Sequence, residues 1–333
     1  MPWSRPWRSI RSAILRPSAP AWKRFSLPTT KGRRTNNMFT VIRYTLRRSR
    51  GAIIGWGIGL AVLGIMMGSL FDMIAGTGDL MAAYMEALPE LAEMFDFAGM
   101  STPIGWLDVE YFSFVPLILG LFVSGVGASL LARDEERGTL DLILAHPVSR
   151  TTLFWGRFLA TTLVTIILLL ISWASLLLSM TWSENFTIPA FELLLPFVSL
   201  FGILMFFMTL ALLFSMVLPA RSMASMLTAM LVVASFFITF LSGAVEQLER
   251  AADFSPLTYL ETATAIEDGL NLTWFGVFLA IDLVLALISW QLFQRRDVRV
   301  GGEGTLRLKD IVTGKWRAKP VEPLTEIGSS AAD

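Results

Sequence analysis

Six long runs of apolar residues, separated by polar segments, dominate the pattern of this chain. Each run holds about the 20 apolar residues that an α-helix needs to cross a bilayer, and none alternates between apolar and polar positions as a membrane-crossing strand does. Only helices and closed barrels satisfy every backbone amide and carbonyl group in lipid. The pattern therefore predicts an all-α membrane protein with six transmembrane helices. The predicted spans cover residues 51–71, 111–132, 158–180, 193–218, 222–244 and 272–293.

Two shorter patterns accompany the spans. Residues 38–50 place Phe39, Ile42 and Leu46 near one helical face and arginines largely on another. This arrangement is typical of an interfacial helix on the cytoplasmic leaflet. Residues 245–271 hold short apolar pieces among acidic residues, and they are too short and too charged to span a bilayer.

Composition and charge place these elements in a membrane. Hydrophobic residues make up 54% of the chain and charged residues 16%, against about 25% charged residues in soluble domains, which excludes a soluble globular protein. Residues 1–50 carry thirteen Lys or Arg and no acid, whereas residues 72–110 carry eight acids and no Lys or Arg. We expect a multi-pass protein of the plasma membrane. Because basic segments stay in the cytoplasm, both termini and the loop 133–157 are expected to be cytoplasmic.

The segment 133–150, RDEERGTLDLILAHPVSR, lies between the second and third predicted spans. Gly138 is expected to interrupt the helix that extends from the second span, and Thr139 to cap a new short helix, LDLILA. Pro147 disfavours helix at the residue before it, and Ser149 can cap the third span. The short apolar helix fits either a groove on a soluble partner or the headgroup region of the bilayer. Its pattern alone does not separate these two interpretations.

The loop resembles the cytoplasmic loop of type-2 permeases of ATP-binding-cassette (ABC) transporters. The matching positions are Glu136-x-Gly138-Thr139-Leu140, Leu142, Leu144, Pro147-Val148-Ser149-Arg150 and Gly156-Arg157. The helix before the first span, FSPLTYLE at 254–261 and FQRRDV at 293–298 are also similar, so the resemblance covers about residues 38–298. His146 departs from the small polar residue that is usual before the proline. The resemblance implies a permease membrane domain over residues 38–298.

In that family the loop carries a coupling helix that rests on a separate ATP-binding subunit. The resemblance implies that ATP-driven closure of two such subunits moves this helix, and that the spans then switch access. It also suggests that residues 245–271 form short re-entrant or surface helices that cap the outer end of the pathway. The implied coupling residues are Glu136, Gly138, Thr139, Leu140, Ile143, Leu144 and Pro147.

Two contacts of the coupling helix are expected. Leu140, Ile143 and Leu144 are predicted to form an apolar ridge that faces the ATP-binding subunit. Glu136 is predicted to anchor the start of the helix by pairing with a basic residue of the N-terminal helix. The candidates for this partner are Arg43 and Arg47.

Several kinds of chemistry are excluded by residue content. The chain has no Cys and a single His, which excludes disulfides, thiol chemistry and a multi-histidine metal site. A phosphate-binding loop needs G-x-x-x-x-G-K-[ST], and the one Gly-Lys pair, Gly314-Lys315, is followed by Trp316. We therefore predict no catalytic residue, no metal site and no cofactor bound by this chain, with ATP and Mg²⁺ used by the partner subunit. Six spans are half of the usual permease complement, so a second permease chain is expected as a further partner, and nucleic acid is not.

Asp282 lies eleven residues into the sixth predicted span. An ionisable group at this depth costs at least ~2.5–3.5 kcal/mol on insertion scales, so it normally faces protein or water. It is either a group that contacts a cation or substrate, or a protonated carboxyl that is hydrogen-bonded to Ser or Thr on a neighbouring helix. The sequence has no basic residue at similar depth, which favours the second interpretation.

The two ends of the chain lie outside the resemblance. Residues 1–37 are basic and acid-free, which fits a targeting presequence, a disordered basic arm, or an upstream start with Met38 as the true first residue. Residues 299–333 are expected to form a weakly ordered cytoplasmic tail. The predicted function is the permease subunit of an ABC exporter; the alternative is an ABC-type membrane component for metalloenzyme maturation or assembly. An intramembrane enzyme would need paired acids, histidine clusters or Ser/Lys sets, which the spans lack.

Overall fold

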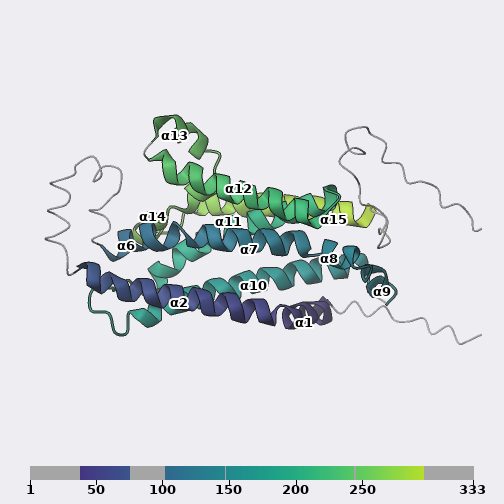
Figure 1. Ribbon diagram of the computed structural model, residues 1–333, viewed down its shortest axis with the longest axis horizontal. Helices are drawn as coiled ribbons and strands as arrows, with labels where there is room; N and C mark the ends of the chain where they lie inside the picture. Colours follow the sequence, from purple (N-terminus) through teal and green to yellow (C-terminus); the bar gives the residue numbers. More distant parts are fainter. Residues whose placement is uncertain (1–37, 76–101, 147, 244, 296–333) are drawn as a thin grey trace, which may run out of the picture.

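The computed structural model describes residues 38–75, 102–146, 148–243 and 245–295 (Figure 1). Within these ranges the chain is helical and holds no strand. The predicted N-terminal extension 1–37 and the predicted tail 299–333 lie outside the described residues. The prediction of an all-α membrane protein is confirmed for the part of the chain that is described.

Among the described residues, six helical stretches are long and apolar enough to cross a membrane, as predicted. The second of them is composite, because a π-helical turn joins two α-helices. The stretches are formed by α2 (Arg50–Ala75), by α6 (Pro103–Trp106) with η2 (Leu107–Phe112) and α7 (Val115–Ser129), and by α10 (Arg150–Ser179), α11 (Ala190–Val217), α12 (Arg221–Ser242) and α15 (Leu272–Arg295).

Two spans begin earlier than the hydropathy pattern predicts. The second begins at Pro103 rather than at residue 111, because the acidic residues of η2 are part of the helix. The third begins at Arg150 rather than at residue 158. The side chain of Ser149 accepts a hydrogen bond from the backbone amide of Thr152 at 3.1 Å, so the predicted cap is confirmed and the helix starts directly after it.

The helices form a bundle in which α11 lies at the centre. It packs against α7, α12 and α15, while α10 packs against α2 (Figure 1). Small residues allow α2 and α10 to approach closely: a Cβ atom on Gly64 would lie 2.0 Å from the hydroxyl of Ser175, and one on Gly68 would lie 1.9 Å from the hydroxyl of Ser179. Such small-residue contacts are the usual basis of helix packing in lipid.

The short helices gather at the two ends of the bundle (Figure 1). One end carries α1 (Met38–Arg48), α8 (Ala132–Glu136), α9 (Leu140–Leu144) and the end of α15. The other end carries α6, α13 (Glu246–Ala252), η3 (Pro256–Leu260) and α14 (Thr262–Glu267). The segment 245–271 is thus mostly helical, as expected; its role as a cap on a pathway stays a prediction. The amphipathic helix expected near residue 38 is present as α1, and its place at a membrane interface also stays a prediction.

Candidate functional site

The loop between α7 and α10 consists of two short helices joined by a tight turn. Gly138 ends α8 with φ +66°, a left-handed conformation that glycine adopts without steric cost. Thr139 occupies the N-cap position of α9, as predicted, but its side chain makes no capping hydrogen bond to that helix. Its amide and its hydroxyl instead donate hydrogen bonds to the carbonyl oxygen of Asp134, at 2.9 and 3.2 Å. Thr139 therefore fastens α9 back onto α8. The predicted coupling residue Pro147 lies outside the described residues.

The apolar face of α9 points in a different direction from the one predicted. Leu140 is 2% exposed and lies in the hydrophobic core, and Ile143 and Leu144 are partly buried against that core. Leu142 is 66% exposed. The prediction that Leu140 contributes to an exposed ridge is wrong, because the turn at Gly138 directs the first residue of α9 into the bundle. The exposed apolar side chain on this helix is Leu142.

An ion-pair cluster around the buried carboxylate of Asp134 holds α8 against two other helices. The carboxylate of Asp134 accepts a hydrogen bond from Nη2 of Arg157 (α10) at 2.5 Å and from Nη1 of Arg48 (α1) at 3.2 Å. Nη1 of Arg157 also donates to the carbonyl oxygen of Leu130 at 2.9 Å. Burial alone raises the pKa of Asp134, but the guanidinium groups of Arg157 and then Arg48 outweigh this effect and hold the pKa below its ordinary value.

Glu136 has a different partner from the one predicted. Its two carboxylate oxygens accept hydrogen bonds from the backbone amide of Arg221 at 3.1 Å and from Nε of Arg221 at 3.2 Å. Arg221 is the first residue of α12, so the carboxylate lies at the positive end of that helix. The expected pairing of Glu136 with Arg43 or Arg47 is therefore wrong. Residues two apart on a helix point in nearly opposite directions, about 200° around the axis, so Asp134 faces α1 while Glu136 faces α12.

These contacts tie the loop to helices that are distant in sequence. Asp134 connects it to α1 and α10, and Glu136 connects it to α12. At the same end, Nη1 of Arg150 donates to the last carbonyl oxygens of α15, on Phe293 and Gln294, at 3.3 and 3.4 Å. A displacement of α9 would consequently act on several spans at once.

A mainly apolar cavity of about 660 Å³ lies beside this loop. It is bordered by α1 through Val41 and Tyr44, by α9 through Leu142 and Ile143, and by α10 through Leu153. Arg48, Asp134 and Arg157 lie in the same lining. The loop thus offers an apolar recess next to its exposed leucine, with charged groups at its border.

Asp282 is buried in the bundle, with 5% exposure. Its Oδ1 accepts a hydrogen bond from Oγ1 of Thr209 on α11 at 3.3 Å, and its Oδ2 has no hydrogen-bond partner among the described residues. The expected hydrogen bond to Ser or Thr of a neighbouring helix is confirmed. This geometry supports a role in packing α15 against α11, and a role of Asp282 in substrate contact stays a prediction.

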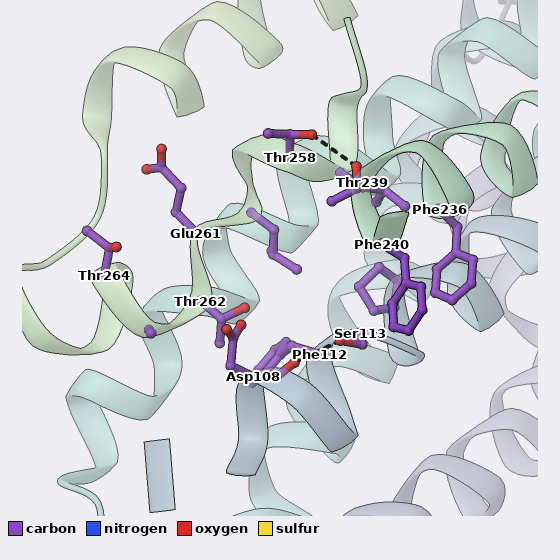
Figure 2. A pocket seen from close by; sticks show the side chains of 14 residues that line it. Asp108, Phe112, Ser113, Phe236, Thr239, Phe240, Thr258, Glu261, Thr262 and Thr264 are labelled. Atoms are coloured by element: carbon purple, nitrogen blue, oxygen red, sulfur yellow. Dashed lines mark hydrogen bonds between the residues drawn. The ribbon is translucent and has the colours of Figure 1, made fainter. Parts of the chain in front are cut away.

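The opposite end of the bundle holds a second cavity, of about 380 Å³ (Figure 2). Three segments line it: η2 with the start of α7, the end of α12, and η3 with α14. The lining includes the carboxylates Asp108 and Glu261 and the rings of Phe112, Phe236 and Phe240. Figure 2 draws Asp108 on one side of the cavity and the rings of Phe236 and Phe240 on the other.

The FSPLTYLE segment builds one wall of this second cavity. Ser255 is buried and shares hydrogen bonds with the hydroxyls of Ser235 at 2.5 Å and Thr239 at 2.6 Å, both on α12. The hydroxyls of Thr239 and Thr258 are 3.0 Å apart (Figure 2). These bonds hold η3 against the end of α12 and so fix the cavity between them.

The model of the ABC-2 family transporter proteins matches residues 45–298, which is well over half of the chain. The matched region includes the loop with α8 and α9, all six candidate spans and the whole lining of the second cavity. In the recess beside α9, Val41 and Tyr44 precede the matched region. No curated protein matches the chain.

Proposed function

Because the chain belongs to the ABC-2 family of transporter proteins and is thus an ABC transporter permease, we propose that it exports a substrate across the plasma membrane. A separate ATP-binding subunit hydrolyses the ATP that drives this movement. In this proposal the ATP-binding subunit exerts force on one end of the bundle, and the spans of this chain rearrange in response.

The observation that carries this proposal is the loop between α7 and α10. It presents Leu142 outward, at 66% exposure, while Asp134 and Glu136 fasten the base of the loop to α1, α10 and α12. An exposed apolar side chain on a firmly connected element suits a contact that transmits force. The coupling function of Glu136, Gly138, Thr139, Ile143, Leu144 and Pro147 is kept within this proposal.

The recess beside α9 gives the partner a place to bind. We propose that the ATP-binding subunit covers Leu142 and inserts apolar side chains between α1 and α9, against Tyr44 and Val41. Burying a leucine-sized side chain contributes roughly 1.5–3 kcal/mol. That contribution is large enough for one residue to decide whether the complex survives purification.

The charges at the two ends support one orientation. α1 carries Arg43, Arg47 and Arg48 beside the α9 loop, whereas acids predominate among the described residues at the α13 end. Basic segments remain on the cytoplasmic side. We therefore propose that the α9 end faces the cytoplasm, where ATP and the ATP-binding subunit are found.

A second permease chain completes the proposed assembly. In the most apolar part of α2, and likewise of α12 and of α15, only 22% of the residues are buried within this chain. In a membrane the remaining surface is covered by lipid or by another membrane protein. We propose that one part of it contacts a second permease, identical or similar to this one.

The coupling proposal is tested by changing the exposed leucine alone. Leu142→Asp is expected to weaken co-purification with the ATP-binding subunit of the same transporter by tenfold or more, because every ~1.4 kcal/mol is a factor of ten. Leu142→Met is the matched control, since it preserves an apolar side chain of similar volume, and it should retain the subunit. If Leu142→Asp keeps both the subunit and transport-coupled hydrolysis in reconstituted vesicles, α9 is not the docking element.

A further inference from the structure

We propose that the cavity between η2, α12 and α14 is a binding site for an organic cation. Its lining brings two carboxylates, Asp108 and Glu261, together with the rings of Phe112, Phe236 and Phe240 in one space of about 380 Å³ (Figure 2). That volume lies within the range of pockets that hold small molecules. More than a hundred residues separate Asp108 and Phe112 from the other three groups in the sequence, and only the fold brings the two sets together.

The charge of the cavity selects a cation. The described residues that line it include two carboxylates and no Lys, Arg or His. Nearby described segments add further acids, among them Glu110 and Asp253, and Arg250 is the one basic residue described at this end of the bundle. A cleft lined by one sign of charge concentrates ions of the opposite sign.

The aromatic rings favour an organic cation over a bare metal ion. The rings of Phe236 and Phe240 are stacked, with centroids 5.8 Å apart and an interplanar angle of 14°, and the side chains of both residues line the cavity. An aromatic face attracts an ammonium or guanidinium group that lies within about 6 Å of the ring centroid. Among the described residues, moreover, no three His, Cys, Asp or Glu side chains are grouped as a metal site requires.

Hydroxyl groups complete the polar side of the cavity. Oγ of Ser113 donates to the carbonyl oxygen of Asp108 at 3.1 Å, and Oγ1 of Thr239 is 3.0 Å from Oγ1 of Thr258. One oxygen of Glu261 accepts from Nδ2 of Asn271 at 3.2 Å. These contacts hold the walls in place, so the cavity is formed before any ligand arrives.

This site bears on what the protein moves. If the chain exports a substrate as proposed above, a cation site at the outer end makes organic cations the substrate class. That step rests on the proposed function, whereas cation binding itself does not. The test therefore measures binding to the purified permease without ATP or the ATP-binding subunit.

A single cysteine serves as the reporter, because the natural chain has none. Ala263→Cys places a thiol in the cavity lining without removing a side-chain hydrogen bond, and Thr187→Cys places one on the exposed segment between α10 and α11. The rate of modification by the neutral reagent methyl methanethiosulfonate is measured with benzyltrimethylammonium, benzyl alcohol or phenylacetate. We expect the cation to slow modification of Ala263→Cys at least fivefold, and the other two probes to leave the rate unchanged. Thr187→Cys should be unaffected by all three.

Two further changes, made in the Ala263→Cys background, test the individual groups. Asp108→Asn should raise the concentration of benzyltrimethylammonium that gives half-protection about tenfold, as expected for the loss of a charged partner. Phe236→Leu should raise it about two- to fivefold, the magnitude of one exposed cation–π contact. Each variant must elute as a single peak in size-exclusion chromatography and keep the unprotected modification rate, which shows that its cavity is intact.

Several outcomes overturn the inference. One is the absence of protection by the cation, and another is equal protection by the cation and benzyl alcohol, which would show an apolar recess without charge selection. If the concentration of benzyltrimethylammonium that gives half-protection is unchanged in both variants, the cation binds elsewhere. If the cation binds but α9 does not dock an ATP-binding subunit, the cation site is supported and the proposed transport function is refuted.

Discussion

Asp134 and Arg157 form a buried ion pair, with 2.5 Å between Oδ2 and Nη2, where the α8 loop meets the first turns of α10. Arg48 of α1 contacts the other carboxylate oxygen at 3.2 Å. Removing one partner of a buried pair leaves an uncompensated charge, which costs more than the pair itself contributes. This relationship makes Asp134 the residue on which the position of the loop depends most.

Asp134→Asn should therefore destabilise the protein strongly. Breaking a buried pair in this way costs about 3–5 kcal/mol. The matched change, Glu136→Gln, removes a pair whose side chains are 37% and 46% exposed and should cost at most about 1 kcal/mol. Melting temperatures measured in detergent should fall clearly for the first variant and barely for the second. Equal effects of the two changes would show that the burial of Asp134 does not matter for stability.

The contribution of Asp134 should depend on pH only under acidic conditions. The pKa of this carboxyl in the folded protein is lowered from 3.8. A depressed folded pKa gives stability that is fully present above the unfolded pKa and is lost as the pH falls through the folded pKa. The difference in melting temperature between the wild type and Asp134→Asn should hence stay constant from about pH 5 to pH 8 and shrink below about pH 4. A difference that already shrinks between pH 7 and pH 5 would contradict the assignment.

Glu136→Gln should separate docking from coupling. Glu136 contacts Arg221 at the start of α12, whereas the surface expected to bind the partner lies at Leu142. The variant should keep the ATP-binding subunit but lose most of the stimulation of hydrolysis by transport in reconstituted vesicles. Asp141→Asn, which removes an exposed acid from α9 itself, is the control and should retain coupling. Loss of coupling in both variants would mean that the charge of the loop matters, and not its link to α12.

The six spans could be predicted because runs of about 20 apolar residues have few alternatives in a chain of this composition. Their ends were predicted less well. Asp108 and Glu110 suggested a loop, yet they belong to the π-helical turn η2 within the second span. Acids at the end of a span can reach water while the backbone remains helical, so hydropathy places such a boundary too late.

The partners of the loop's side chains depend on where each residue lies around the axis of α8 or α9. The sequence alone does not show this position. Glu136 belongs to the recognisable pattern, but the acid that faces α1 is Asp134, two positions earlier. Leu140 also belongs to the pattern and is buried, while Leu142 is exposed. One signal was present: Arg157 stands in an otherwise apolar stretch and therefore requires an acidic partner.

The second cavity could not have been predicted from the sequence. Asp108, Phe236 and Glu261 come from three segments, near the start of one span, within another and in the segment between two spans, and none of them alone indicates a binding site. Their meeting depends on the hydroxyl contacts between Ser255 and α12, which hold the FSPLTYLE segment against the bundle. Long-range assembly of this kind has no local signature in the sequence.

The orientation of the bundle can be tested with two single cysteines in this Cys-free chain. Ala145 is exposed beside α9 and Thr187 is exposed at the opposite end. Because the arginines of α1 lie at the α9 end, and basic segments stay in the cytoplasm, Thr187→Cys should react with a membrane-impermeant maleimide in intact cells. Ala145→Cys should react only after the membrane is opened. Both should react in detergent, which controls for burial of the thiol. The reverse pattern would place α9 outside, where it meets no ATP, and would refute the coupling proposal together with the direction of export.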